Sequence, residues 1–367
     1  MGPRGSGKST WLRATFPNAY VIDLLSERTY QRLLAAPGQF ADELRAIDAN
    51  RWVIVDEVQR LPGLLNEVHR FIEEKRLRFV LCGSSARKLK RAGINLLAGR
   101  ALHRAMHPFV PEELGARFDL EESLRYGVLP IVWDSTAREE TLTAYAQLYL
   151  KEEIQAEALV RNLSGFARFL PLAALFHGQV INASTISREA GVARTTVAGY
   201  LDILEETLLC FRLPAYEAKL RVRERKLPKW YWCDPGIVRA MKRSTGIVTP
   251  EERGALFEGM VAQLIRAYMD YRGICDDMYY WAPAARSATE VDFLIVRGND
   301  IIAIEAKSGS TFTESWCRGL RAVAKLRGLQ SQIIVYPDGP VLQTKDRIDV
   351  VPFKNFAAQL AGGSLWP

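Results

Sequence analysis

The chain has 367 residues, 48% of them hydrophobic and 25% charged, a balance typical of a globular protein with two or three domains. Its five cysteines are far apart and form no C-x-x-C pair, which argues against a disulfide scaffold or a zinc ribbon and for a reducing cytoplasm. No signal peptide and no run of about 18 apolar residues is visible, so no membrane association is expected, while the net charge of +7 mildly favours an anionic partner.

The first part of the chain alternates short apolar runs with helical stretches. Candidate strands are residues 19–24, 52–57, 78–83 and 101–108. This rhythm predicts a parallel sheet whose strands are joined by crossover helices.

A glycine-rich motif opens the chain and fits G-x-x-x-x-G-K-[ST] at every defined position. The glycines let backbone N–H groups turn around phosphates, and the helix that follows adds its positive dipole. The residues expected to contact the nucleotide are Gly2, Pro3, Arg4, Gly5, Ser6, Gly7, Lys8, Ser9 and Thr10. Lys8 should reach the β- and γ-phosphates, and Ser9 should supply a hydroxyl to magnesium.

A pair of acids closes the second apolar run. The sequence Val53-Ile54-Val55 leads directly into Asp56 and Glu57. Asp56 would hold the magnesium through water, and Glu57 would polarise the water that attacks the γ-phosphate. The glycine loop and the acid pair together predict a P-loop ATPase that uses ATP and Mg²⁺.

Two further positions are candidates for nucleotide contact. Ser85 or Ser84, which follow the strand at 78–83, could place a polar group near the γ-phosphate; alternatively, they cap the next helix. Arg100 would be an arginine finger acting on a neighbouring subunit's nucleotide, which implies a homo-oligomer, or else an arginine on the surface.

The glycine loop begins at the first residue, whereas a P-loop normally follows a buried strand. We expect that the start of the gene was placed too late or that the protein was truncated. An intact-mass measurement of the native protein against 41.3 kDa tests this expectation.

Residues 120–180 are expected to be helical, because apolar positions recur at three and four. Residues 184–216 then read as helix, turn, helix and strand, with Gly191 supplying the left-handed turn. This pattern predicts a helix-turn-helix whose second helix contacts bases. The residues at the start of that helix are Arg194, Thr195 and Thr196.

A basic loop at 217–229 follows, between strands at 208–213 and 229–233 that would flank a wing. Its arginines suit contacts with DNA phosphates, which would make binding fall with salt. These arginines are Arg221, Arg223 and Arg225. The alternative is that the module only packs domains or mediates subunit contacts.

The last part of the chain has a different order of elements. It reads as a helix, three strands, a helix and a strand, at residues 251–272, 277–282, 289–296, 300–307, 313–328 and 331–336.

Two acids and a lysine stand in these apolar strands. Strand periodicity puts Glu305 and Lys307 on one face, and Asp292 lies on the preceding strand. Buried without partners these charges would be costly, and a divalent metal bridging Asp292 and Glu305 removes that cost. Glu258 could add a metal ligand, and Lys307 could activate water for attack on a phosphodiester. The alternative is a salt-bridged sheet edge without metal.

Together these motifs resemble a bacterial and archaeal family, an AAA+ type ATPase fused to the domain of unknown function numbered 4143. The resemblance covers nearly the whole chain, including the glycine loop, the acid pair and the runs 199–205 and 228–236. The C-terminal part resembles the PD-(D/E)XK nuclease fold. Its acid and lysine positions are matched by Glu258, Asp292, Glu305 and Lys307. The resemblance implies ATP binding, DNA binding and nuclease activity.

The predicted fold is α/β: a parallel P-loop NTPase sheet at 1–115, a helical lid and winged-helix module at 116–235, and a PD-(D/E)XK nuclease-like domain at 236–367. The predicted function is that of an ATP-dependent DNA-processing enzyme with Mg²⁺ or Mn²⁺ at the nuclease-like site. One alternative is an ATP-gated DNA-binding or signalling switch whose nuclease fold is inert. Another is a protein-interaction ATPase with no DNA partner.

Overall fold

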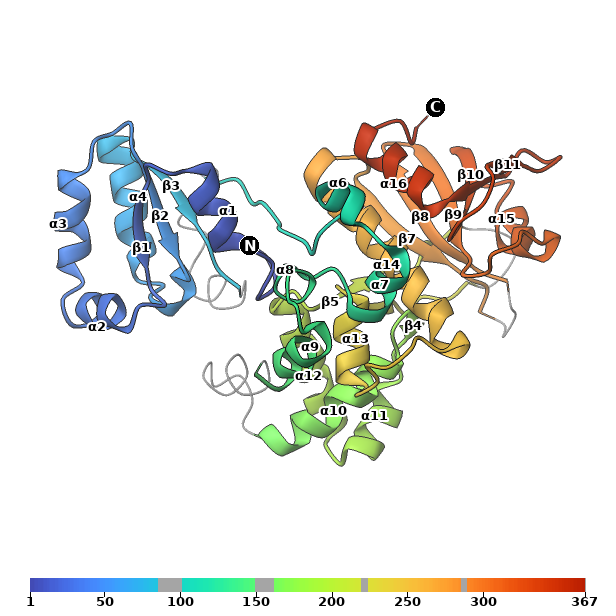
Figure 1. Ribbon diagram of the computed structural model, residues 1–367, viewed down its shortest axis with the longest axis horizontal. Helices are drawn as coiled ribbons and strands as arrows, with labels where there is room; N and C mark the ends of the chain where they lie inside the picture. Colours follow the sequence, from blue (N-terminus) through green and yellow to red (C-terminus); the bar gives the residue numbers. More distant parts are fainter. Residues whose placement is uncertain (85–100, 149–161, 219–223, 285–288, 367) are drawn as a thin grey trace. The chain divides into compact units, whose positions relative to one another are not determined.

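A computed structural model describes residues 1–84, 101–148, 162–218, 224–284 and 289–366 (Figure 1). The chain divides into two compact units, Met1–His107 with Glu206–Leu208 and Pro108–Glu205 with Leu209–Pro367. Within the described ranges, none of the helices combines the length and apolar character that crossing a membrane requires.

The N-terminal unit is built on a parallel sheet of three strands in the order β1-β2-β3. Its strands are β1 (Tyr20–Asp23), β2 (Trp52–Asp56) and β3 (Arg78–Leu81). Its helices are α1 (Lys8–Thr15), α2 (Glu27–Ala35), α3 (Gly38–Ala46), the short 3-10 helix η1 (Val58–Arg60) and α4 (Leu64–Lys75). The central strand β2 is buried from Val53 onward, as expected for a parallel strand covered on both faces.

Three of the four strands predicted in this unit are confirmed, and the fourth, at 101–108, is not formed. The segment hydrogen-bonds to Met1 instead. The Met1 amine donates to the carbonyl oxygen of Arg104 at 2.7 Å, and the N–H of Met106 donates to the carbonyl oxygen of Met1 at 2.7 Å. Bonds to a single residue do not make a strand, because a ladder needs a series of paired residues.

The second unit begins with helices, which confirms the helical prediction in its described part. They are α6 (Pro111–Leu114), η3 (Gly115–Arg117), α7 (Leu120–Tyr126), α8 (Pro130–Trp133), α9 (Arg138–Leu148) and α10 (Leu163–Leu175). Side chains fix two of the helix starts: Asp119 accepts from the N–H of Glu122, and Asn162 from that of Gly165.

The predicted helix, turn, helix and strand follow. The elements are β4 (Gln179–Val180), α11 (Ala183–Ala190), α12 (Arg194–Glu206), β5 (Cys210–Leu213), β6 (Lys229–Trp232) and α13 (Pro235–Met241). Gly191 ends α11 with a φ of 65°, the left-handed conformation that the sequence predicted. The strands form an antiparallel sheet in the order β4-β6-β5, with β6 in the centre.

The rest of the unit is a six-stranded mixed sheet, in the order β11-β12-β10-β9-β8-β7, with helices on it. Its elements are α14 (Pro250–Arg272), β7 (Asp277–Trp281), β8 (Val291–Arg297), β9 (Asp300–Ala306), η5 (Glu314–Cys317), α15 (Arg318–Ala322), β10 (Leu329–Tyr336), β11 (Leu342–Gln343), β12 (Asp349–Pro352) and α16 (Phe353–Gly362).

Alternate residues of this sheet enter two cores. Phe293 and Ile304 pack in the core that includes residues of α14 and α16, whereas Leu294 and Ala303 pack with residues of α15 (Figure 1). The predicted helix, three strands, helix and strand are all present, but the second helix was predicted too long. Residues 323–329 make successive i to i−3 turns in place of α-helical bonds. The two strands β11 and β12 and helix α16 were not predicted.

Candidate functional sites

The glycine loop turns sharply before α1. Gly5 and Gly7 have φ angles of 76° and 81°, in the left-handed region where a side chain would be strained. The N–H of Ser6 donates to the carbonyl oxygen of Pro3 at 3.3 Å, and α1 begins at Lys8 directly after the loop. A turned loop followed by a helix N-terminus is an arrangement suited to phosphate.

Two side chains anchor this loop. The Nζ of Lys8 is buried and donates to the carbonyl oxygens of Gly2 and Pro3, each at 2.8 Å. The hydroxyl of Ser9 donates to Oδ2 of Asp56 at 2.6 Å. Asp56 ends β2, so the first turn of α1 and the end of that strand meet, although the two residues are 47 positions apart. The predicted magnesium ligands are therefore neighbours.

The second acid of the pair is held by polar side chains from two other segments. Glu57 has a φ of 54°, which turns the chain at the end of β2. The amide Nε2 of Gln59 donates to the carboxylate of Glu57 and to the Oγ of Ser84 at 3.3 Å. The Ser84 hydroxyl lies 3.4 Å from Oε2 of Glu57 and donates to it.

Gln59 was missed by the sequence analysis. Its side chain is 2% exposed, and a side chain added at Gly83 would collide with its amide. The sequence offered one local indication of its role, namely that Gln59 is a polar residue in the turn directly after the acid pair. Ser84 was considered, with Ser85, as a polar group near the γ-phosphate or as a helix cap, and its hydroxyl contacts Glu57.

Of the remaining candidates for nucleotide contact, two lie on the surface and two lie outside the described residues. Arg4 and Thr10 are exposed. Ser85 and Arg100 lie outside the described residues.

The acids and the lysine of the C-terminal sheet come together as predicted. Strands β8 and β9 are antiparallel with Phe293 paired to Ile304, and continuing this register sets Asp292 opposite Glu305. Both side chains are buried. The N–H of Ala306 donates to Oδ2 of Asp292 at 2.9 Å.

Lys307 and Glu305 form an ion pair, with Nζ 2.5 Å from Oε1. The other carboxylate oxygen of Glu305, Oε2, is buried and makes no hydrogen bond within the described structure. An unpartnered buried oxygen is costly, which marks this position as one that a further ligand would satisfy.

A second lysine, from β6, enters the same cluster and was missed by the sequence analysis. The Nζ of Lys229 lies 3.0 Å from Oε1 of Glu258, 3.4 Å from Oε1 of Glu290 and 3.7 Å from Oδ1 of Asp292. The hydroxyl of Tyr231, two residues along the strand, donates to the same oxygen of Glu258. Lys229 had been counted as part of a basic loop.

The proximity of like charges and burial shift the ionisation of this cluster. Burial raises the pKa of Asp292 well above its ordinary value, and the charges of Glu305 and Glu258 add to the shift. Burial raises the pKa of Glu305 to about 7. Burial opposes the charge of Lys229, but the carboxylates led by Glu258 outweigh it and raise the pKa of that lysine.

In the part of the chain that the structure describes, no group of three or more His, Cys, Asp or Glu residues is arranged to hold a metal ion. Glu258 and Asp292 instead share the ammonium group of Lys229.

The start of α12 carries the residues predicted to contact bases. Arg194 and Thr195 are exposed, and Thr196 is half-buried. Ile186 of α11 and Val197 of α12 belong to the same buried core. Of the loop arginines, Arg225 is half-buried and its N–H donates to the carbonyl oxygen of Ala282 at 2.9 Å. Arg221 and Arg223 lie outside the described residues.

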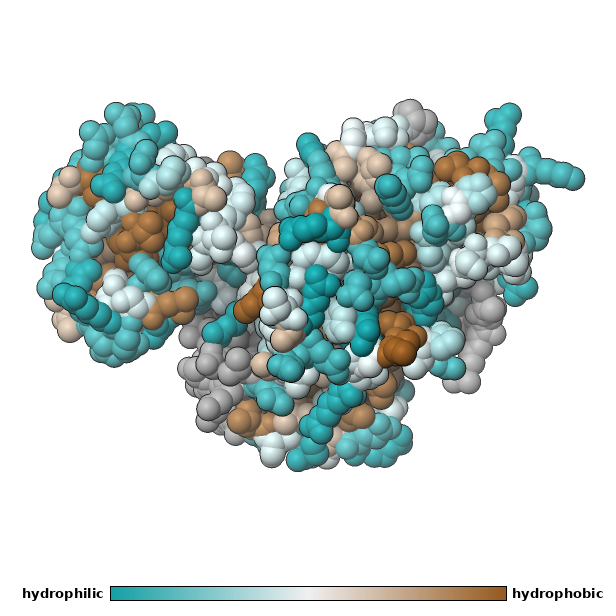
Figure 2. Space-filling view, viewed as in Figure 1, coloured by the Kyte–Doolittle hydropathy of each residue, from teal (hydrophilic) through white to brown (hydrophobic). Residues whose placement is uncertain are grey.

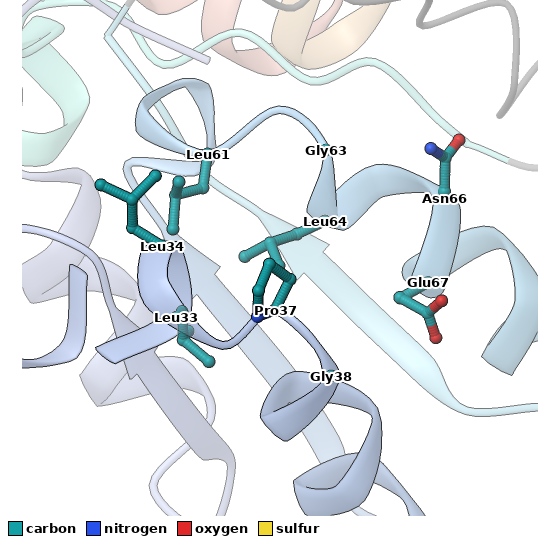
Figure 3. Close-up of a pocket in the computed structure, with 9 residues that line it drawn as sticks. All are labelled: Leu33, Leu34, Pro37, Gly38, Leu61, Gly63, Leu64, Asn66 and Glu67. Carbon is teal, nitrogen blue, oxygen red and sulfur yellow. The ribbon is translucent and has the colours of Figure 1, made fainter. Parts of the chain in front are cut away.

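The N-terminal unit also has an apolar area on its surface (Figure 2) and a pocket of about 290 Å³ (Figure 3). Leucines from three segments line this pocket, among them Leu34, Leu61 and Leu64. It contains no residue of the glycine loop or of the acid pair. The pocket is therefore separate from the predicted phosphate site.

The three regions of the chain match three family models. Residues 1–115 match an AAA domain, residues 117–248 a domain of unknown function (DUF8612), and residues 253–356 a domain of unknown function (DUF4143). The chain is therefore an AAA-domain protein in which DUF8612 and DUF4143 follow the P-loop domain. This confirms the resemblance to an AAA-type ATPase fused to DUF4143 and adds DUF8612, which covers the segment predicted as a helix-turn-helix. An AAA domain implies nucleotide binding.

The chain is similar to curated proteins whose function is not described. It is 24% identical to the uncharacterized proteins Rv2008c of Mycobacterium tuberculosis and Mb2031c of Mycobacterium bovis, over 96% of this chain and 78% of theirs. Among solved structures, it matches the RuvB Holliday junction branch migration motor of Thermotoga maritima at 16% identity and a TM-score of 0.27, over 58% of this chain and 80% of that one.

Proposed function

We propose that the N-terminal unit binds MgATP and hydrolyses it. The observation that carries this proposal is the hydrogen bond from Ser9 to Asp56, which brings together the hydroxyl and the acid that hold magnesium in P-loop ATPases. Bound magnesium would neutralise charge on the β- and γ-phosphate oxygens. Ser9 and Asp56 would hold the ion. Lys8 would exchange the carbonyl oxygens of Gly2 and Pro3 for phosphate oxygens.

Glu57 would take the remaining task, to orient the attacking water and accept its proton. Gln59 and Ser84 hold its carboxylate in place. Purified full-length protein should therefore bind ATP with Mg²⁺ and release phosphate. An absence of both nucleotide affinity and phosphate release, with and without DNA, would overturn the proposal.

We infer a second activity for the C-terminal sheet, metal-dependent hydrolysis of a DNA phosphodiester. Its support is the position of Asp292 opposite Glu305 beside Lys307, with one oxygen of Glu305 that has no hydrogen-bond partner among the described residues. Carboxylate oxygens are the ligands that Mg²⁺ and Mn²⁺ prefer. Asp292 and Glu305 would hold the ion, with Glu258 as a further ligand, and Lys307 would orient the water.

The helix-turn-helix supports DNA as the partner, since Arg194 and Thr195 are exposed at the start of its second helix. DNA binding measured across a salt series should weaken as salt rises, and less steeply for Arg194→Ala. Binding that is absent at low salt would favour the protein-interaction ATPase.

Cleavage needs a separate test. The full chain is incubated with DNA, Mg²⁺ or Mn²⁺, and ATP, beside Lys8→Ala and Lys307→Ala. The proposal expects cleavage by the wild type and none by Lys307→Ala. If no condition gives cleavage, the alternative holds, an ATP-gated DNA-binding or signalling switch with an inert nuclease fold. Cleavage that survives Lys307→Ala would come from another site or a contaminant.

A further inference from the structure

We propose that Lys229 and a divalent cation compete for the carboxylates of the C-terminal sheet, so that β6 of the DUF8612 region controls whether this site can take up metal. The proposal rests on the inferred metal site and adds a regulator to it. It also explains why the acids of this site, as the structure describes them, do not form a metal-binding group.

The first support is the position of the Lys229 ammonium group. Its side chain is 3% exposed, and its Nζ contacts carboxylate oxygens of Glu258, Glu290 and Asp292 at 3.0 to 3.7 Å. Glu258 comes from α14, and Asp292 from β8. A divalent ion bound by these acids would lie among the same oxygens, so the ammonium group and the ion exclude one another.

The second support is the balance of charge. The cluster contains four carboxylates and two ammonium groups, namely Glu258, Glu290, Asp292, Glu305, Lys229 and Lys307. The carboxylates of the cluster therefore outnumber its ammonium groups even with both lysines in place. The Oε2 of Glu305 is buried near Gly319 of α15 and makes no hydrogen bond in the described structure. A divalent cation that also binds Glu305 would stabilise these carboxylates more than the single charge of Lys229 does.

The third support is a route for Lys229 to leave. Its backbone is fixed in the central strand β6, next to the fully buried aromatic side chains of Tyr231 and Trp232. Its side chain, however, is a flexible four-carbon stem. Glu290 marks the open side of the cluster, since its side chain is 36% exposed. The ammonium group can turn toward this side without moving the strand.

The same β6 lies beside the module predicted to bind DNA. Strand β6 pairs with β5, which follows the second helix of the helix-turn-helix after a short turn. A shift of β5 would therefore be passed to Lys229 through its paired strand β6. The cluster thus links the DUF8612 region to the acids of the DUF4143 region.

The test is Mn²⁺ binding to the full chain without nucleotide, by titration calorimetry and electron paramagnetic resonance. Lys229→Met, which keeps the stem and removes the charge, should bind Mn²⁺ at least tenfold more tightly than wild type. Lys229→Arg should behave as wild type. The gain should disappear in Lys229→Met with Asp292→Asn, which assigns it to this cluster. Equal Mn²⁺ affinity in wild type and Lys229→Met would overturn the proposal.

A measurement on the unaltered protein covers the case in which Lys229→Met does not fold. The amine of Lys229 is acylated with acetic anhydride and followed by mass spectrometry, with the exposed Lys226 as internal control. Acylation of Lys229 should rise at least fivefold with saturating Mn²⁺, and that of Lys226 should not change. An acylation rate of Lys229 that Mn²⁺ leaves unchanged would refute competition.

These outcomes are distinct from those of the nuclease proposal. If Lys229→Met gains Mn²⁺ affinity but no variant cleaves DNA, the competition stands and the nuclease activity fails. If wild type cleaves DNA and Lys229→Met changes neither cleavage nor Mn²⁺ affinity, the nuclease stands and the competition fails.

Discussion

Each of the two candidate sites contains a buried lysine, but the lysines are held differently. Two hydrogen bonds of Lys8 go to the backbone carbonyls of Gly2 and Pro3. Lys229 contacts carboxylate oxygens of three acids. A lysine can exchange a neutral carbonyl oxygen for a phosphate oxygen at little cost, whereas carboxylates that lose their buried cation must either stay charged without a partner or take up a proton. Lys8 can therefore change partners when a phosphate binds, whereas Lys229 is already paired with carboxylates of the protein.

The largest effect expected from this difference is on stability. Lys229→Ala should destabilise the second unit by about 3–5 kcal/mol, because it leaves buried carboxylates without their cation. Urea unfolding at pH 7, followed through tryptophan fluorescence, measures the change. Lys226→Ala is the matched control, since the ion pair of Lys226 with Glu217 is exposed, and its cost should be within about 1 kcal/mol. An equal loss of unfolding free energy in the two variants would mean that Lys229 is not a buried counter-charge for these carboxylates.

The second effect concerns ATP. Lys8→Ala should lower kcat/KM for ATP hydrolysis about 10²–10³-fold, the usual loss for one group that stabilises a developing negative charge. Phosphate release at saturating Mg²⁺ measures it. Lys75→Ala removes another amine held by backbone carbonyls, those of Leu44, Arg45 and Ile47, far along the chain from the motif. Its hydrolysis rate should stay within twofold of wild type. A similar loss in both variants would indicate a general structural effect.

The third effect sharpens the role of the residues around Glu57. Gln59→Ala should lower kcat about tenfold and leave KM for ATP nearly unchanged, because the amide orients the carboxylate and does not bind substrate. Steady-state kinetics separates the two constants. Gln39→Ala, which removes an amide that accepts from Arg32 on the surface, is the control. A raised KM with unchanged kcat would place Gln59 in nucleotide binding.

The fourth effect concerns a buried base, His177. Burial, with Lys242 nearby, lowers the pKa of His177 from 6.5 to about 3, so the native state keeps this imidazole neutral. Its Nδ1 accepts from the N–H of Trp232 at 3.1 Å. Between about pH 6.5 and pH 3 the unfolded chain binds a proton that the native state does not. Stability from this group is therefore present above pH 6.5 and is lost as pH falls, by at most about 1.4 kcal/mol per pH unit.

His177→Asn keeps an acceptor and removes the titration. Urea unfolding at pH 7, 6 and 5 should show a shallower loss of stability for this variant than for wild type. Parallel pH profiles would mean that His177 is protonated in the native state.

The sequence predicted those features that depend on neighbouring residues. Gly5 and Gly7 adopt positive φ in the loop and Gly191 does so in the helix-turn-helix, because these conformations are set by the residue itself. The structure adds the register, since β8 and β9 are joined by a tight connection that sets Asp292 opposite Glu305. The strand predicted at 101–108 and the length of the helix predicted at 313–328 were wrong. A local apolar pattern does not specify which strand a segment pairs with or where a helix gives way to turns.

By itself, then, the sequence determined the glycine loop, the acid pair and most of the order of strands and helices, which arise from local conformation and periodicity. Only the tertiary structure decided which lysine meets which acid. Lys229 is 29 residues from Glu258 and 61 from Glu290, and Gln59 is 25 residues from Ser84. Contacts over such separations depend on how the elements pack, because no short-range rule of chain geometry brings these side chains together.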